Sequence, residues 1–541
     1  MRNDWGITKK AAIGVLGVVL LTGTMCGCAK KTVSVSDKTL TKSEFTNPLI
    51  KEDADGNIVY GGDPSVMVDG DTVYLYTGHD VSTDTEVSDS IYNIPEYLCY
   101  SSTDLKNWTN EGVVMNMKDV SWASNDTSAW ASQVIKHADP DTEKDMYYLY
   151  YCSWAKTGKQ SIGVAVSDSP TGTFTDLGKP LVSGSVTKIA TSTYNDIDPT
   201  VWIDTDENGE EHRYLAWGNG LFFCCELNED MISVKDQNGD GKITCATSIE
   251  DGDIINNQKG LDSYTEAPWL YRSQDENGDY YGDYYLFFAY GWREGMGYAT
   301  IDDPMTGSWS GSTMFMAPTA TSNTNHEAIF DFDGKTYMIY HDGALPAGNG
   351  FRRSACIREI TFEDDGSVTP CTETTASLFG NTVTIAANGG ESISHESFTN
   401  SVADSDYPYV GLVVGTGLSD KEADNEWVLV DGKASGSGDV TSDSRDANGS
   451  YVSIESENKT GLYLTVSGDK IVLSQDTDAS AETAASQTFI STTALNGDEN
   501  GTSFMLLSST DDAPRYISVS EDGSLVVTDG SDADSSTFTI S

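Results

Sequence analysis

A short pattern, a polar turn followed by an aromatic-rich strand, recurs five times between residues 44 and 380. The copies begin at Asp69, Glu143, Asn208, Asn277 and Asp333, and four of them carry Asn-Gly or Asp-Gly. These pairs tolerate the positive φ angles of tight β-hairpin turns. The copies lie 56 to 74 residues apart, enough chain for one four-stranded sheet each. Five such copies in an all-β chain predict a five-bladed β-propeller.

A second recurring element supports this architecture. An aromatic residue (Trp108, Phe174 or Trp309) follows a polar turn late in three of the repeats, and we expect these turns to lead into outer strands. The 10% aromatic content and 51 glycines are typical of an all-β protein with many short strands. A stacked β-sandwich is the alternative, but its strands would not repeat at this period.

The remaining chain predicts a second, smaller all-β domain over residues 381–541, since 541 residues exceed what one core usually organises. Two stretches there resemble each other, with Tyr463 matching Tyr516 and Phe489 matching Phe538. A weaker third copy begins at Phe398. Three copies would make a β-trefoil-like module.

The N-terminus reads as a targeting segment. A basic start is followed by an apolar run over residues 11–21 and by Cys26-Gly27-Cys28. Residues 1–28 resemble a bacterial lipoprotein signal, with Cys28 the better lipid acceptor and Cys26 the alternative. Residues 29–43 would form a flexible linker. We expect a secreted protein, lipid-anchored at the bacterial cell surface, and a plain signal peptide is the alternative.

Charge narrows the range of partners. The chain has 32 Lys and Arg against 84 Asp and Glu, a net charge of −52. Phosphate binding needs basic surface, so nucleic acid is excluded and uronic-acid-rich polymers are disfavoured. A neutral sugar polymer is compatible with this charge, and membrane contact is expected only through the lipid anchor. The seven cysteines beyond residue 28 lack zinc spacing and are expected to be buried on strands.

One residue upstream of each hairpin turn is a candidate for the propeller axis. These are Asp63, Trp130, Asp198, Glu266 and His326, which lie 6 to 13 residues before the turns. The first strand of each blade lines the axis, so the five positions should converge, bringing three acids together. A lone Asp-Pro pair more often starts a turn or strand. Cleavage of a glycosidic bond uses two carboxyl groups, one as acid and one as base or nucleophile.

Several segments in matching order resemble glycoside hydrolase family 43. They are residues 47–50, 61–66, 73–80, 100–108, 128–133, 162–170, 196–202, 266–271 and 350–354. The resemblance implies a five-bladed propeller and hydrolysis with inversion. It makes Asp63 the general base and Glu266 the general acid. Asp198 becomes the third carboxylate, which raises the pKa of the acid and orients it.

The resemblance also implies substrate-binding roles. Arg353 matches an arginine that reaches the hydroxyls of the bound sugar, with Arg352 the competing choice. Trp130 would form a wall against a sugar face, or else belong to the core. His326 matches an axial histidine that helps some relatives hold calcium or water, or else is a buried histidine bonded to backbone. Ala267 departs from the pattern, because relatives often have glycine after the acid.

Calcium is considered separately, since the expected reaction requires no cofactor and calcium would serve only as a structural ion. Asp236, Asn238 and Asp240 place oxygen atoms at alternate positions, as in a calcium loop. The twelfth position is Thr247 rather than a bidentate glutamate. We read this segment and the similar residues 204–209 as acidic turns.

The resemblance implies a β-xylosidase or α-L-arabinofuranosidase that releases pentose from plant hemicellulose such as xylan. An endo-arabinanase or galactan hydrolase is an alternative, and so is a non-catalytic surface glycan-binding lipoprotein, against which the three acids argue. The second domain would bind carbohydrate and concentrate substrate, or serve as a structural appendage.

Overall fold

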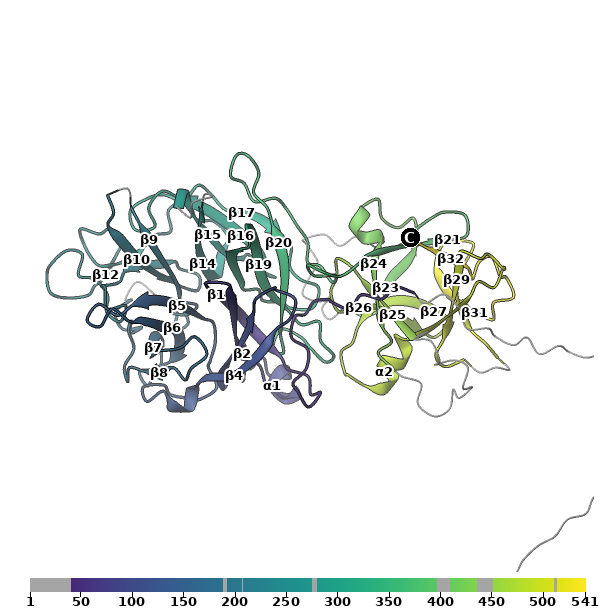
Figure 1. Cartoon of the computed structure of the whole chain (residues 1–541), viewed down its shortest axis with the longest axis horizontal. Helices are drawn as coiled ribbons and strands as arrows, with labels where there is room; N and C mark the ends of the chain where they lie inside the picture. The colour runs from purple at the N-terminus through teal and green to yellow at the C-terminus, as the bar shows by residue number, and fades with distance from the viewer. Residues whose placement is uncertain are drawn as a thin grey trace, which may run out of the picture. The chain divides into compact units, whose positions relative to one another are not determined.

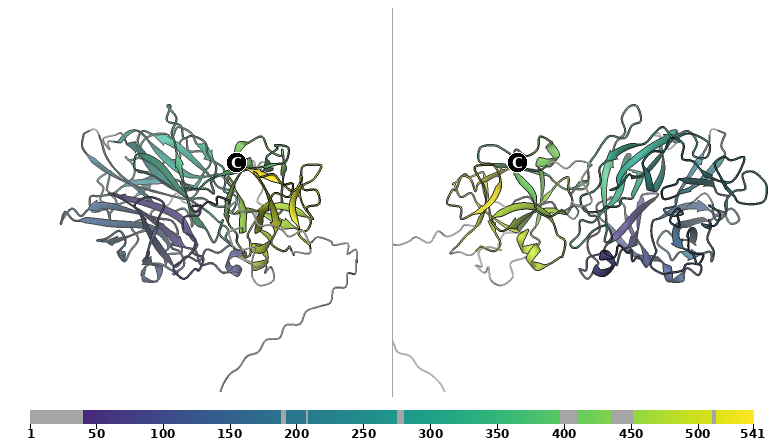
Figure 2. Two further views of the ribbon diagram at one scale, coloured as in Figure 1. Left: turned by 45° about the vertical axis from the view of Figure 1, so that its right-hand side comes forward. Right: turned by 180° about the vertical axis from the view of Figure 1, so that it is seen from behind.

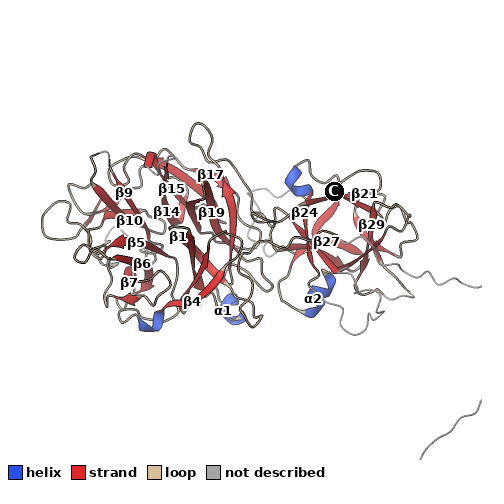
Figure 3. Ribbon diagram, viewed as in Figure 1, coloured by secondary structure: helices blue, strands red, loops and turns tan. Residues whose placement is uncertain are grey.

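The structure, a computed structural model, describes residues 40–187, 192–206, 208–274, 280–396, 409–434, 451–509 and 513–541. The predicted lipoprotein signal, with Cys26 and Cys28, lies outside the described residues, as do the Asn277 turn and Phe398. Almost all regular structure is strand (Figure 3). The two α-helices of the described part are α1 (Asp84–Ser88) and α2 (Ala481–Ser486). Neither is long and apolar enough to cross a bilayer.

Five consecutive sheets form the blades of a propeller (Figure 1). Blade 1 contains β1 (Gly61–Asp69), β2 (Thr72–His79), β3 (Glu96–Ser102) and β4 (Thr109–Asn116). Blade 2 contains β5 (Ser132–Ala138), β6 (Asp145–Trp154), β7 (Gln160–Ser167) and β8 (Thr175–Asp176). Blade 3 contains β9 (Thr200–Thr205), β10 (Glu211–Trp217), β11 (Phe223–Glu226), β13 (Ile254–Asn256) and β12 (Cys245–Ala246). Blade 4 contains β14 (Tyr264–Gln274), β15 (Tyr280–Tyr290), β16 (Gly295–Ile301) and β17 (Thr313–Met316). Blade 5 contains β18 (Glu327–Phe332), β19 (Lys335–Asp342) and β20 (Ser354–Ile360). The predicted five-bladed propeller is therefore confirmed.

The hairpin turns connect the first two strands of the blades, as their turn chemistry requires. In blade 5, Asp333 and Gly334 adopt φ angles of 50° and 75° between β18 and β19. This left-handed backbone is the conformation that Asp-Gly and Asn-Gly pairs tolerate best. The turns before Trp108, Phe174 and Trp309 lead into β4, β8 and β17, the outer strands predicted for them.

Hydrophobic side chains fill the spaces between neighbouring blades. Adjacent residues of β6 point to opposite faces: Leu149 joins a cluster with blade 1, and Tyr150 joins one with blade 3. Because side chains alternate along a strand, a blade buried on both faces needs a continuous apolar run. This explains the aromatic-rich second strands seen in the sequence. Each such side chain contributes about 1.5–3 kcal/mol by leaving water.

The ring closes where the segment before blade 1 meets the outer strand of blade 5. The side-chain amide of Asn47 donates to the Ile357 carbonyl (2.9 Å) and its oxygen accepts from the Ile357 N–H (2.9 Å). The N–H of Leu49 donates to the carbonyl of Ala355 (2.8 Å). These bonds join the two ends of the propeller chain, so the first and last blades are held together.

Residues beyond the propeller form a second all-β unit with its own core. Its strands are β21 (Val383–Ala387), β22 (Ile393–His395), β23 (Leu412–Thr416), β24 (Glu426–Asp431), β25 (Tyr451–Ser456), β26 (Leu462–Ser467), β27 (Lys470–Gln475), β28 (Phe489–Thr493), β29 (Gly501–Leu506), β30 (Tyr516–Val519), β31 (Leu525–Thr528) and β32 (Phe538–Ile540). Their pairing runs from β27 through β25, β21 and β29 to β31, and β31 pairs with β27 again, which closes the sheet. Trp427, Phe489 and Phe538 are buried inside it. The strands from β21 onward form one group in both views of Figure 2. The β-trefoil assignment stays a prediction.

Candidate active site

Two inner strands, β1 and β14, carry a one-residue bulge at an X-Pro pair, and a third X-Pro pair lies just before β9. In β1, Gly62 pairs with Gly78 and Ser65 with Tyr76, so three residues of chain in β1 are matched by two in β2. The same offset occurs in β14, between Glu266 and Trp269. The residue before each proline has a left-handed φ: 48° at Asp63, 60° at Asp198 and 54° at Ala267. A β-bulge re-aims the side chain it carries.

The bulges refine the expected equivalence of the three acids. Asp63 and Asp198 are the residues of left-handed φ before a proline, whereas in blade 4 Ala267 takes that position and Glu266 lies one residue earlier. The preference for glycine after the acid now has a physical reason, because glycine adopts a positive φ without steric cost. Ala267 accepts the same φ with its methyl group fully buried.

A cavity of about 700 Å³ lies at this end of the five inner strands. Asp63, Trp130, Asp198, Glu266 and Arg353 line it, so five of the six predicted site residues meet at one cavity. The sixth, His326, does not line the cavity, but its Nδ1 lies 3.9 Å from Oδ1 of Asp63. The structure places Arg352 elsewhere, since its guanidinium pairs with Asp84 at 2.6 Å.

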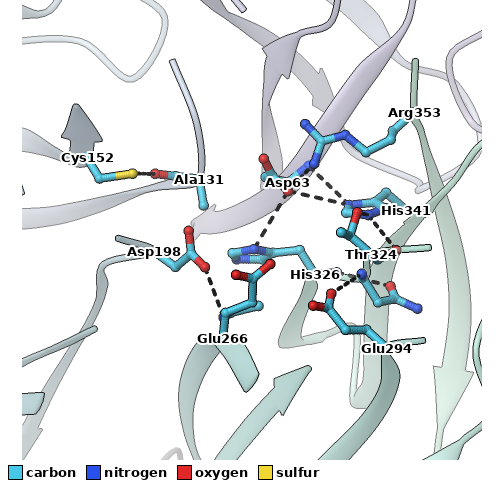
Figure 4. A network of polar contacts seen from close by, with 12 residues as sticks. Asp63, Ala131, Cys152, Asp198, Glu266, Glu294, Thr324, His326, His341 and Arg353 are labelled. Carbon is cyan, nitrogen blue, oxygen red and sulfur yellow. Dashed lines mark hydrogen bonds and ion pairs between the residues drawn. The ribbon is translucent and has the colours of Figure 1, made fainter. Parts of the chain in front are cut away.

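Asp63 lies against cationic and imidazole groups (Figure 4). Nη1 of Arg353 donates to Oδ1 of Asp63 at 2.5 Å. Nε and Nη2 of Arg353 donate to the two oxygens of Asp80 at 2.9 and 3.0 Å, which fixes the guanidinium plane. Burial alone would raise the pKa of Asp63, but the charge of Arg353 and its hydrogen bond to Asp63 oppose burial, and the net pKa is lowered. Asp63 is therefore ionised across the physiological range.

The two histidines beside Asp63 are neutral. Burial lowers the pKa of His326 to about 4 and that of His341 to about 3. Nδ1 of His341 accepts the backbone N–H of Asp63 (3.2 Å), so its proton lies on Nε2, which donates to the Thr324 carbonyl (3.0 Å). This tautomer holds the backbone of the bulge in place.

Glu266 has a different environment. Its Oε2 accepts a short hydrogen bond from the side-chain amide of Asn219. Burial raises the pKa of Glu266 to about 7 and the charge of Asp63 adds to the rise, although Asn219 and Arg353 oppose it. Oδ2 of Asp198 accepts the backbone N–H of Ala267 (3.0 Å), the peptide that follows Glu266. Burial, Glu266 and Asp63 raise the pKa of Asp198 well above its ordinary value.

Aromatic side chains form two parts of the cavity wall. Tyr194 stacks on Trp130, with ring centroids 6.1 Å apart and planes 8° from parallel, and it meets Trp154 edge to face. Elsewhere in the wall, Tyr92 contacts Phe351 with centroids 4.6 Å apart. Trp130 also packs against two of the inter-blade clusters, so it belongs to both the wall and the core. Such rings suit the apolar C–H faces of sugars.

Five residues around the cavity were missed by the sequence analysis, and they share one signal. Each lies at or just after the end of the second strand of a blade: Asp80, Trp154, Asn219, Glu294 and His341. The two strands of a hairpin are antiparallel, so the second one returns to the end where the first began. Counting downstream from each hairpin turn, as well as upstream, would have found them.

Calcium has little support from the geometry. The side-chain oxygens of Asp236 accept the N–H groups of Gly239 and Gly241, both at 2.8 Å, so they close their own turn. In the second acidic turn, Oδ1 of Asp206 likewise accepts the N–H groups of Asn208 and Glu210, at 2.9 and 2.8 Å. Residue 207 of this turn is not described. Within the described ranges, no three His, Cys, Asp or Glu side chains are grouped to hold a metal. We therefore derive no step through a metal.

Comparison with known proteins identifies the family of the chain. Residues 45–368 match the family described as glycosyl hydrolases family 43. The chain is 28% identical to "Xylosidase/arabinosidase 43A" of Humicola insolens, over 57% of this chain and 96% of that protein. It is 27% identical to a "Xylosidase/arabinosidase" of Bacteroides ovatus, over 57% and 94%.

A solved structure of a GH43 β-xylosidase/α-arabinofuranosidase from a compost microbial metagenome, in complex with xylotriose, is 26% identical. The alignment covers 58% of this chain and 94% of the chain in that structure, with a TM-score of 0.44. The family match spans more than half of the chain and contains all five blades and every acid of the cavity. This chain belongs to glycosyl hydrolase family 43.

Proposed function

We propose that this protein is an inverting glycosidase that releases pentose from hemicellulose fragments, as a β-xylosidase, an α-L-arabinofuranosidase or both. One observation carries the proposal: the cavity holds an ionised carboxylate, Asp63, and a carboxyl with a pKa of about 7, Glu266. Glycosidic cleavage needs one carboxyl group in each of these states.

Glu266 acts as the general acid in this proposal. With a pKa of about 7, it holds its proton in mildly acidic and neutral solution and can give it to the departing oxygen. Asp198 supports it through the peptide of Ala267, which fixes the backbone next to Glu266. The repulsion between Asp198 and Glu266 is mutual, so both hold protons at a higher pH than an isolated acid would.

Asp63 acts as the general base. Its carboxylate removes a proton from water as the water oxygen attacks the anomeric carbon from the face opposite the leaving group. Arg353 occupies Oδ1, so we assign the proton transfer to Oδ2. The bidentate contact between Arg353 and Asp80 fixes the orientation of the guanidinium. The guanidinium in turn holds the carboxylate of Asp63 at the cavity.

The relatives support pentosides as substrates. Those named above are xylosidase/arabinosidases, and an arabinoxylan arabinofuranohydrolase of Paenibacillus polymyxa is 30% identical over 60% of this chain. A β-D-galactofuranosidase of Aspergillus niger is also 30% identical, over 52% of this chain. We therefore place xylosides and arabinofuranosides first and galactofuranosides next.

The setting of the enzyme is proposed from its sequence. A lipid on Cys28, or on Cys26, would hold it at the cell surface, where polymer fragments arrive from outside. The all-β unit after the propeller would bind carbohydrate and raise the local concentration of substrate, or would serve only as a structural appendage.

A panel of nitrophenyl glycosides tests the proposal. The purified protein should hydrolyse the β-xyloside, the α-L-arabinofuranoside or both, and proton NMR of the first-formed sugar should show the inverted anomer. No turnover of any pentoside or arabinoxylan fragment would contradict the enzymatic function and favour a glycan-binding role. A retained anomer would contradict the role of Asp63.

A further inference from the structure

Glu294 is a fourth acid of the cavity, and the mechanism above does not use it. It lies in the connection between β15 and β16 of blade 4, the blade that also carries Glu266. It lines the cavity although only 2% of its surface is exposed. A carboxyl group so deeply buried is costly unless its environment compensates for the lost water.

One end of this carboxyl group is anchored. Oε2 of Glu294 accepts the backbone N–H of Asn325 at 2.8 Å, and the backbone N–H of Glu294 donates to the carbonyl of Asn323 at 3.3 Å. Both partners belong to the segment just before His326. The side chain is therefore held between blades 4 and 5.

The other oxygen is available. Oε1 of Glu294 makes no hydrogen bond to the described part of the chain, yet it is not among the fully enclosed polar atoms that lack a partner. Because the residue lines the cavity, this oxygen faces it. A bound molecule is the remaining source of a partner.

The surroundings favour the uncharged form of the carboxyl group. Burial, followed by the negative charges of Glu266, Asp198 and Asp63, raises the pKa of Glu294 well above its ordinary value. The neighbouring Arg293 does not compensate, since its Nη2 is committed to the carbonyls of Thr319 and Ser322. A neutral carboxyl group both donates and accepts a hydrogen bond.

Sugar hydroxyls also donate and accept, so this group complements them. We infer that Glu294 is a sugar-binding residue whose cavity-facing oxygen bonds to a ring hydroxyl of the glycoside that Glu266 protonates. The inference rests on the proposed function, and Glu294 would help decide which pentose fits.

The test is a double-mutant cycle between Glu294 and the sugar hydroxyls. It uses the nitrophenyl pentoside turned over best and its three single-deoxy analogues, each measured for kcat/KM with the wild type and with Glu294→Ala. Removing the contacted hydroxyl should lower wild-type kcat/KM by about 10- to 100-fold. In Glu294→Ala that one loss should nearly vanish, while the losses for the other two hydroxyls remain.

Conservative variants serve as controls. Glu294→Gln keeps a donor and an acceptor, so it should retain most of the selective loss. Glu327→Gln makes the same change at another fully buried acid that does not line the cavity, and it should reproduce the wild-type pattern. Glu294→Asp replaces the alanine variant if the latter fails to melt cooperatively, because its shorter side chain cannot reach both Asn325 and the sugar.

Two negative results have different meanings. The first case is a wild type that turns over pentosides and a Glu294→Ala variant, or the aspartate variant in its place, whose kcat/KM falls as much as that of the wild type for each of the three deoxy analogues. Glu294 then does not touch the sugar, and the inference is overturned. If the wild type turns over no pentoside, the proposed function fails and the inference falls with it.

Discussion

The two sides of the central cavity carry carboxyl groups in opposite electrostatic settings. Around Asp63 lie a guanidinium and two neutral imidazoles, and its pKa is lowered. Near Glu266 lie an amide and two further acids, Asp198 and Glu294, and burial, with the charge of Asp63, raises the pKa of Glu266 to about 7. β1 and β14, which carry Asp63 and Glu266, have the same bulge, so the difference comes from the neighbours: the charge of Arg353 acts on Asp63, whereas burial dominates at Glu266. The propeller brings the acids together, and the groups around each acid set its protonation state.

Removing the base should give the largest effect. Asp63→Asn keeps the size of the side chain but removes the carboxylate, and we expect kcat to fall by about 10³- to 10⁴-fold. Asp80→Asn is the matched control, because Asp80 also binds Arg353 but does not line the cavity. Steady-state kinetics would contradict the assignment if Asp80→Asn lost as much as Asp63→Asn.

Removing the general acid should lower kcat less than removing the base when the substrate has a good leaving group. Glu266→Gln should lower kcat on nitrophenyl pentosides by about 10²- to 10³-fold, since nitrophenolate needs little protonation. The loss on unactivated oligosaccharides should be greater. Equal losses on both kinds of substrate, with an unchanged melting temperature, would show that Glu266 is not the acid.

A single methyl group should disturb the Asp63 side alone. A Cβ at position 62 would lie 2.2 Å from the guanidinium carbon of Arg353, so Gly62→Ala must displace that side chain. We expect kcat/KM to fall about 100-fold, because small misplacements of reacting groups are costly. The alkaline limb of the pH profile, which reports Glu266, should stay where it is. A Gly62→Ala variant with wild-type kcat/KM would show that the position of Arg353 does not matter for the reaction.

The pH profile should sharpen the contrast between the two sides. Glu266 must be protonated, so kcat/KM should fall as the pH rises through about 7, while the acid limb should lie below the ordinary pKa of aspartate.

Asn219 lowers the pKa of Glu266, and Asn219→Ala should move the alkaline limb up by about one unit. An alkaline limb that stays in place or moves down would contradict this role of Asn219.

The smallest effect is expected at Ala267. Glycine adopts its φ of 54° without strain but loses a buried methyl group. Ala267→Gly should therefore change the free energy of unfolding by no more than about 1 kcal/mol. Ala267→Val should be clearly destabilised, since a β-branched residue resists positive φ. Denaturant unfolding of both variants checks this, and equal stabilities would argue against the bulge.

The fold could be predicted because its signal is local. A turn such as Asp333-Gly334 fixes a hairpin by its own backbone preferences, and five such turns count the blades. Convergence of Asp63, Asp198 and Glu266 followed from that count. The one-residue offset of Glu266 did not, because a bulge is set by pairing with the second strand.

The partners of the acids were harder to predict. Asn219, Glu294 and His341 come from second strands or the connections after them. Asn219 and His341 bond to Glu266 and Asp63 of neighbouring blades, and the charges of Glu266, Asp198 and Asp63 act on Glu294. Their importance depends on packing between segments distant in sequence. Arg353 was found only through the family resemblance, since nothing local marks an arginine after β19 as the partner of Asp63.

The most direct test of the division of labour is the dependence of kcat/KM on the leaving group in Asp63→Asn and Glu266→Gln. A series of aryl pentosides with phenols of increasing pKa should be compared in the wild type and both variants. We expect Glu266→Gln to show a much steeper decline than the wild type, because no proton reaches the departing oxygen. Asp63→Asn should be slow throughout, with the slope of the wild type. A steep decline in Asp63→Asn, or a wild-type slope in Glu266→Gln, would contradict the account.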